Sequence, residues 1–193
     1  MHGETAETIQ GVAHKLMVER GYSAFSYADI SETVGIRKAS VHHHFSSKAD
    51  LAAAVLTTHR ERLEQAMGLL DDEIEDPLMR LTAYVQHWER CIRDRSMTFC
   101  VAAMLGAEMP SLPAEVQAQV RLHFSTLAQW IEKTLKAGVK AGVIRLEETA
   151  ATEAQILMAV VHGAMLSARA SGVDKVYKSA TEGALRRISR KGN

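Results

Sequence analysis

The chain has 193 residues, of which 47% are hydrophobic and 24% are charged, a composition typical of a soluble globular protein of one domain or two small ones. The formal net charge is zero, so overall charge does not indicate a nucleic-acid partner. The first residues lack the basic and apolar segments of a signal peptide, and no apolar run approaches the roughly 20 residues of a membrane span. We therefore expect a cytoplasmic protein in which Cys91 and Cys100 are thiols rather than a disulfide.

The N-terminal third of the chain predicts four helices. Apolar residues spaced three and four apart predict the first helix over about residues 4–20. Ser26 begins a second helix, which ends near Gly35, and a short turn leads to a third helix over about residues 38–45. A longer helix follows over about residues 48–70. Two short helices joined by a turn with a glycine are typical of a helix-turn-helix, whose second helix lies in the major groove of DNA.

The rest of the chain also favours helices, since proline is rare and no run of alternating β-branched residues predicts a strand. An acidic linker precedes Pro77, which is well placed at the first position of a helix. The segments predicted as helical are residues 77–92, 99–105, 114–140, 149–170 and 175–189. We therefore expect an all-α fold of about nine helices.

One segment has the residue types and spacing of a family signature. Residues 22–30 read YSAFSYADI, residues 34–45 read VGIRKASVHHHF, and residues 48–51 read KADL. This segment resembles the N-terminal signature of the TetR family of one-component transcriptional regulators, and the resemblance covers about residues 5–55. It implies a three-helix DNA-binding domain over residues 1–50 and a helical ligand-binding and dimerisation domain over residues 51–193. It also implies a homodimer that binds a palindromic operator, most often as a repressor, and is released by a small-molecule or electrophile effector.

The third predicted helix carries most of the expected DNA contacts. Val41 and Phe45 are apolar and one turn apart, so we expect them to face the core. The small residues Ala39 and Ser40 allow contact with base edges, whereas the basic residues and histidines around them reach phosphates. The residues assigned to DNA binding are Ser26, Tyr27, Arg37, Lys38, Ala39, Ser40, His42, His43, His44 and Lys48. The alternative is a solvated basic turn that has no partner.

Two residues at the same helix depart from the family pattern, and its histidines raise the alternative of a metal site. The family commonly has a tyrosine where this chain has His42, and a small capping residue where it has Arg37. The run of three histidines suggests a metal site, but successive helical residues point about 100° apart and cannot converge on one ion. We find no other Cys/His metal spacing, so the sequence predicts neither a metal site nor a cofactor.

The C-terminal part carries candidates for a small-molecule pocket. Side chains that place polar or polarisable groups among apolar ones line such pockets, and the candidates are His87, Cys91, Cys100, Met104 and His162. The segment from Cys100 also resembles a TetR subgroup with a cysteine at the start of the sixth helix, which senses electrophiles. A helix N-terminus would lower the pKa of a thiol, so one hypothesis is that Cys100 is a reactive sensor thiol. The alternative is that Cys100 is a small buried hydrophobic residue.

The helix predicted over residues 149–170 is apolar almost all round, with the small residues Ala159, Gly163 and Ser167 among larger ones. We expect it to pair with the final helix in a dimer interface to which Tyr177, Leu185 and Ile188 contribute. No catalytic or phosphate-binding motif is present, so an enzyme is not expected. A helical protein-binding adaptor remains an alternative, because acidic residues slightly outnumber basic ones over residues 1–67.

Overall fold

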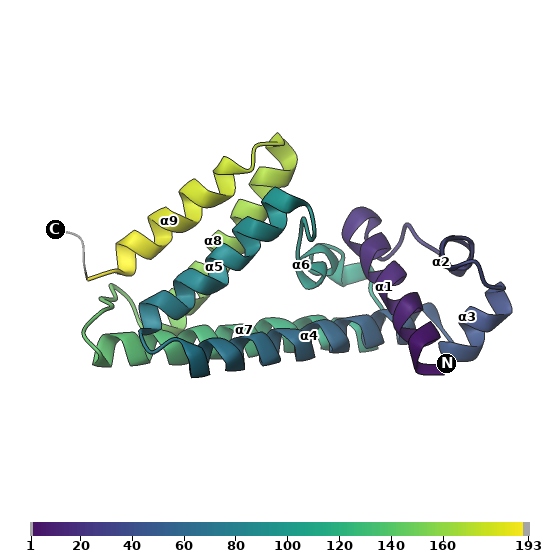
Figure 1. Ribbon diagram of the computed structural model, residues 1–193, viewed down its shortest axis with the longest axis horizontal. Helices are drawn as coiled ribbons and strands as arrows, with labels where there is room; N and C mark the ends of the chain where they lie inside the picture. Colours follow the sequence, from purple (N-terminus) through teal and green to yellow (C-terminus); the bar gives the residue numbers. More distant parts are fainter. Residues whose placement is uncertain (1, 191–193) are drawn as a thin grey trace. The chain divides into compact units, whose positions relative to one another are not determined.

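The computed structural model describes residues 2–190, and within them the fold is all-α, as predicted (Figure 1). The β pairing in this part of the chain is limited to an isolated bridge between Ile144 and Ser189. The described residues contain no helix long and apolar enough to cross a membrane. The helical elements are α1 (His2–Arg20), α2 (Tyr27–Val34), α3 (Lys38–His44), α4 (Lys48–Glu73), α5 (Pro77–Asp94), α6 (Val101–Gly106), the 3-10 turn η1 (Met109–Ser111), α7 (Ala114–Lys140), α8 (Ala150–Ser171) and α9 (Lys175–Ile188).

Residue contacts divide the chain into two compact units. The first contains the chain up to Arg62 together with Cys100–Phe124, and the second contains Leu63–Phe99 and the chain from Ser125 onward. The expected boundary after residue 50 lies inside α4, which continues through it without a break. The unit that carries the helix-turn-helix also includes α6 and the first part of α7.

The first unit has a continuous apolar core. The inward face of α1 contributes Ile9, Ala13 and Met17, which are fully buried. Ile30 of α2 and Val41 of α3 are also fully buried, so the short helices are held by their apolar faces. Burial of this kind stabilises short helices that would be marginal in isolation.

A carboxylate holds the loop between α1 and α2. The Glu108 carboxylate, at the start of η1, accepts hydrogen bonds from the backbone N–H of Tyr22 at 2.8 Å and of Ser23 at 3.2 Å. Gly21 precedes these residues with φ at +80°, the left-handed conformation that ends α1. The loop that leads into the helix-turn-helix is therefore fixed by a residue 86 positions away.

Gly21→Ala should destabilise the protein by about 2 kcal/mol. A Cβ at Gly21 would lie 2.0 Å from Glu108 Oε1, on a backbone conformation that alanine rarely adopts. The matched control is Gly11→Ala inside α1, where the added Cβ meets nothing within 4 Å and should stabilise the helix by up to about 1 kcal/mol. Urea unfolding measures both changes, and equal stabilities of the two variants would contradict the prediction.

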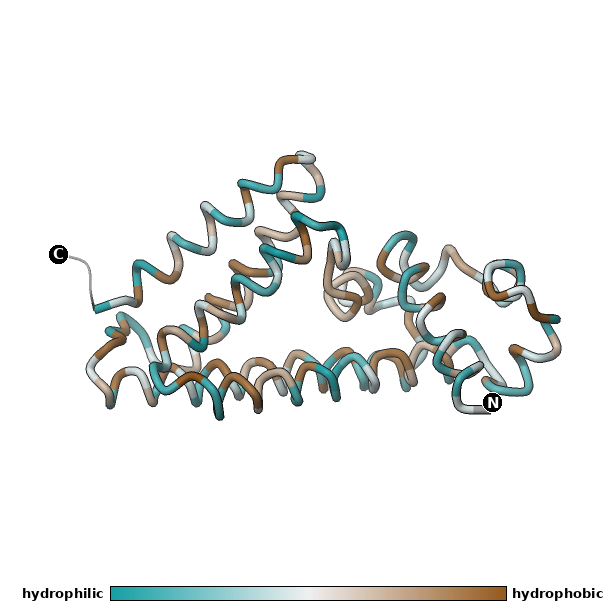
Figure 2. Tube along the Cα trace, in the orientation of Figure 1, coloured by the Kyte–Doolittle hydropathy of each residue, from teal (hydrophilic) through white to brown (hydrophobic). Residues whose placement is uncertain are grey.

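The second unit packs α5, α8 and α9 together, and α5 and α9 alternate hydrophobic and hydrophilic residues along their length (Figure 2). Tyr177 of α9 is fully buried, and its hydroxyl donates a hydrogen bond to the Val85 carbonyl oxygen at 3.0 Å. Leu185 and Ile188 are buried as well. The expectation that these three residues contribute to a dimer interface was therefore wrong, because their side chains are buried within the second unit of a single chain.

An ion pair ties the start of α8 to the end of α9. The Glu153 carboxylate is 1% exposed and accepts hydrogen bonds from Nη1 of Arg187 at 3.0 Å and from its Nη2. It also accepts the backbone N–H groups of Glu147 and Glu148, both at 3.3 Å. The Arg187 guanidinium holds the pKa of Glu153 below its usual range, so the carboxylate is charged at neutral pH.

Candidate nucleic-acid interface

The α2–turn–α3 segment has the local geometry of a helix-turn-helix. Ser26 caps α2, and its backbone N–H donates to the Asp29 carboxylate at 2.8 Å in a reciprocal capping box. Gly35 ends α2 with φ at +75°, which allows the chain to turn sharply into α3. Arg37 occupies the N-cap position of α3 and makes no side-chain cap there, as its departure from the usual small residue suggested.

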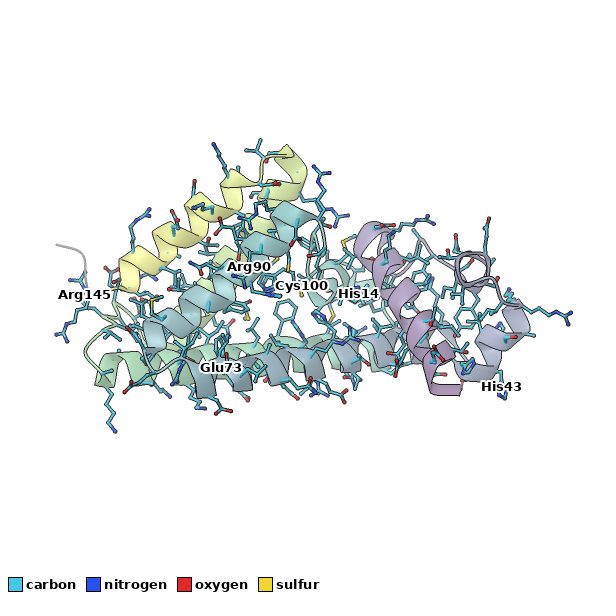
Figure 3. The ribbon with its side chains drawn as sticks, in the orientation of Figure 1. His14, His43, Glu73, Arg90, Cys100 and Arg145 are labelled. Atoms are coloured by element: carbon cyan, nitrogen blue, oxygen red, sulfur yellow. The ribbon has the colours of Figure 1, made fainter. Side chains whose placement is uncertain are left out.

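Helix α3 presents a basic surface on one side and packs on the other. Val41 is fully buried, and Phe45, which ends the helix, is half-buried. No acidic residue lies within α3. Ser40 and His44 are half-buried. His43 is exposed on α3 (Figure 3). The exposed candidates in α3 and at its N-cap are Arg37, Lys38, Ala39, His42 and His43.

Tyr27 and Lys48, both assigned to DNA contact from the sequence, have structural partners. Tyr27 is buried, and its hydroxyl donates to the Phe45 carbonyl oxygen at 2.9 Å. Lys48 Nζ donates to the Phe25 carbonyl oxygen and lies 4.7 Å from the centre of the Tyr22 ring. Burial lowers the pKa of Lys48. These two side chains position the end of α3 and the start of α4. The candidate surface for DNA consists of the exposed residues of α3.

The five pocket candidates do not fall in one unit. His87, Cys91 and His162 belong to the second unit, whereas Cys100 and Met104 belong to the first. His87 is exposed on α5, and its Nε2 lies 3.6 Å from the sulfur of buried Cys91. None of the five lines the cavity of about 370 Å³ beside α1 and α4, or the cavity of about 210 Å³ in the second unit.

Cys100 is 1% exposed at the N-cap of α6. Burial raises the pKa of its thiol to about 11, and the backbone N–H groups of Ala103 and Ala102 oppose this effect only in part. The direction of this shift contradicts the hypothesis of a thiol activated by the helix N-terminus and agrees with the alternative of a buried residue. Cys100 Sγ lies 3.7 Å from Nε2 of both His59 and His123, neighbours that no sequence spacing marked.

Cys100 should resist alkylation by N-ethylmaleimide in the folded protein. With a pKa of about 11, only about one thiol in ten thousand is ionised at pH 7, and the thiolate is the reactive form. Mass spectrometry after brief treatment should find Cys100 unmodified in buffer and modified in urea. An adduct at Cys100 in the folded protein would instead support the electrophile sensor.

A capped helix, a tight turn and a second helix with an exposed basic face define a DNA-binding helix-turn-helix protein. Comparison with known proteins agrees: residues 9–55 match the bacterial regulatory proteins of the tetR family, and residues 77–184 match the tetracyclin repressor-like C-terminal domain. The chain belongs to the TetR family of transcriptional regulators, which are non-enzymatic DNA-binding proteins.

Three relatives illustrate the similarity. A TetR-family regulator from Agrobacterium tumefaciens is 44% identical, covers 98% of this chain and 100% of its own, and has a TM-score of 0.96. The transcriptional repressor DhaR from Mycobacterium sp. (strain GP1) is 26% identical over 79% of this chain and 76% of its own length. Reduced NemR from E. coli has the same fold, with 21% identity, a TM-score of 0.83, and coverage of 96% of this chain and 97% of its own.

Proposed function

We propose that this chain is a transcriptional repressor that binds a palindromic operator as a homodimer and is released by a small-molecule effector. The observation that carries the proposal is the exposed, acid-free surface of α3 at the end of a capped helix-turn-helix. The repressor role is supported by the similarity to DhaR, which is named as a repressor.

In this proposal the residues of α3 have separate roles. Arg37 and Lys38, exposed at the start of α3, contact phosphates and set the register on the duplex. Ala39 and Ser40 have short side chains at the same end, so the helix approaches the base edges there. His42, His43 and His44 extend the phosphate contacts along the helix. Tyr27 holds the end of α3 through its hydrogen bond to the Phe45 carbonyl oxygen, Ser26 caps α2, and Lys48 joins the start of α4 to the loop before α2.

A stripe on α8 supports the homodimer. Gln155, Ala159, Gly163, Leu166 and Ala170 are exposed at helical spacing, and Leu166 is 58% exposed. A Cβ built at Gly163 meets nothing within 4 Å, so a second helix has room to approach closely. Two-fold pairing through such a stripe would match a palindromic operator.

Leu166→Glu should therefore convert a dimer into a monomer. A charge buried without a partner at a packed interface costs several kcal/mol. Because each 1.4 kcal/mol or so weakens the dimer about tenfold, this cost should dissociate it. Leu69→Glu is the matched control, because Leu69 of α4 is 57% exposed and lies off the stripe. Light scattering measures the mass, and a monomeric unmodified protein, or equal dissociation by both variants, would contradict the assignment.

The function is tested by fluorescence anisotropy with purified protein and DNA from the region flanking its own gene, at two salt concentrations. The expected result is tight binding that exceeds binding to scrambled DNA and weakens as salt rises, because phosphate contacts release counterions. Equal, weak binding to both DNAs would favour the protein-binding adaptor. Expression of a reporter gene under the same operator should rise when the protein is deleted, and a fall would reject the repressor role.

A further inference from the structure

Three side chains that commonly bind metals meet inside the first unit, although they come from separate parts of the chain. Cys100 precedes α6, His59 lies on α4 and His123 lies on α7. The sulfur is 3.7 Å from Nε2 of each histidine, and the three potential ligand atoms all lie within 4.8 Å of one another. The two imidazole rings are stacked, with centroids 5.0 Å apart and planes inclined by 25°.

These separations are close to those of a zinc site. Zinc binds a thiolate sulfur at about 2.3 Å and an imidazole nitrogen at about 2.0–2.1 Å. At tetrahedral angles, these bonds place the sulfur about 3.6 Å from each nitrogen and the two nitrogens about 3.3 Å apart. The two sulfur–nitrogen distances of 3.7 Å already fit, so only the imidazoles have to approach each other, by at most about 1.5 Å.

The cluster is buried, but one of its members reaches a cavity. Cys100 and His123 are buried, whereas His59 is half-buried and lines the cavity of about 370 Å³ beside α1 and α4. His14 of α1, labelled with Cys100 in Figure 3, lines the same cavity, and its ring centroid is 5.7 Å from that of His59. The cavity offers a route for an ion and room for a water molecule as a further ligand.

We propose that His59, Cys100 and His123 form a zinc site whose fourth position faces this cavity. One thiolate and two imidazoles suit Zn²⁺ and do not suit the hard cations Mg²⁺ and Ca²⁺, which prefer oxygen ligands. On binding, the S–H bond of Cys100 breaks, a sulfur–zinc bond forms and the proton passes to solvent, with no change of oxidation state. The sequence did not predict this site, because 41 residues separate Cys100 from His59 and 23 separate it from His123.

The test uses the full chain, stripped of metal with a chelator and kept reduced with a phosphine, and Co²⁺ as the spectroscopic probe. The unmodified protein should bind one Co²⁺ per chain with a thiolate-to-cobalt charge-transfer band, and one equivalent of Zn²⁺ should abolish that band. Zinc should also raise the midpoint of thermal unfolding, because it joins α4, α6 and α7 in the folded state only. No charge-transfer band, or binding of Cu⁺ without Co²⁺ or Zn²⁺, would overturn the proposal.

Variants assign the ligands. Cys100→Ala should remove the charge-transfer band, and His59→Gln should weaken Zn²⁺ binding by more than about 10-fold, since even indirect partners of a metal ligand contribute that much. Cys91→Ala is the matched control, because Cys91 is also buried beside a histidine, His87, but belongs to no group of three potential metal ligands among the residues that the structure describes. Circular dichroism checks folding, and Cys100→Ser replaces Cys100→Ala if the latter does not fold. A band that persists in the folded Cys100 variant, or disappears in Cys91→Ala, would contradict the assignment.

Discussion

Replacing Arg37 and Lys38 together by alanine should weaken operator binding by roughly 100-fold or more at physiological salt. Both side chains are exposed at the start of α3, and α3 contains no acidic residue that would neutralise them. In a dimer the substitution removes four positive charges from the interface. The slope of log affinity against log salt should therefore fall by about 3 to 4, since each phosphate contact contributes about 0.9.

The control for this experiment removes two cations outside the helix-turn-helix. Lys136 and Arg186 are exposed, and each forms an ion pair with an acid one turn away on its own helix. Their double alanine variant should bind DNA like the unmodified protein, with the same salt slope. Parallel losses in the two double variants would mean that binding depends on net charge rather than on α3, and the assignment of the recognition surface would fail.

Glu153→Gln should lower the free energy of unfolding by about 3 kcal/mol at pH 7. The substitution removes the charge that Arg187 faces and weakens the acceptor of two backbone N–H groups. Because the folded-state pKa of Glu153 is lowered, its contribution is present above the unfolded-state value near 4.5 and is lost as pH falls below it. The two proteins should therefore converge in stability as the pH is lowered below that value.

Urea denaturation at several pH values measures this effect. The control is Glu147→Gln, because Glu147 is 60% exposed and its carboxylate lies 3.6 Å from the Arg187 guanidinium. Exposed pairs of that kind contribute at most about 1 kcal/mol. Two results would show that the ion pair of Glu153 contributes little to the free energy of unfolding. One is a loss of stability in Glu153→Gln no larger than in Glu147→Gln, and the other is a loss that does not shrink as the pH is lowered.

The sequence predicted the order of the helices because their ends carry local signals. Ser26 with Asp29, Gly35, and Asp76 before Pro77 all form the caps that their residue types suggest. The buried side of α3 followed from the spacing of Val41 and Phe45. Such features depend on a few neighbouring residues, so periodicity and capping chemistry were enough to find them.

The parts that the sequence missed all depend on residues distant along the chain. Lys48 was assigned to phosphate because its position at the start of a helix is visible in the sequence, but its contact with the Phe25 carbonyl oxygen is not. Cys100 was expected to have a lowered pKa from its helix N-terminus, and burial by other helices reverses the direction. The convergence of His59 and His123 on Cys100 has no local signature at all.

The first unit is built from two separate segments of the chain, and this affects how it folds during protein synthesis. Residues 100–124 belong to that unit, and Glu108 holds the loop before α2, so the N-terminal segment cannot complete its packing when it leaves the ribosome. At roughly 5–20 residues per second, the 62 residues from Leu63 to Phe124 take about 3 to 12 seconds to add. A nonsense mutation before this point would yield a fragment without its own complete fold. Early truncations should therefore behave as simple losses of function rather than release an active DNA-binding fragment.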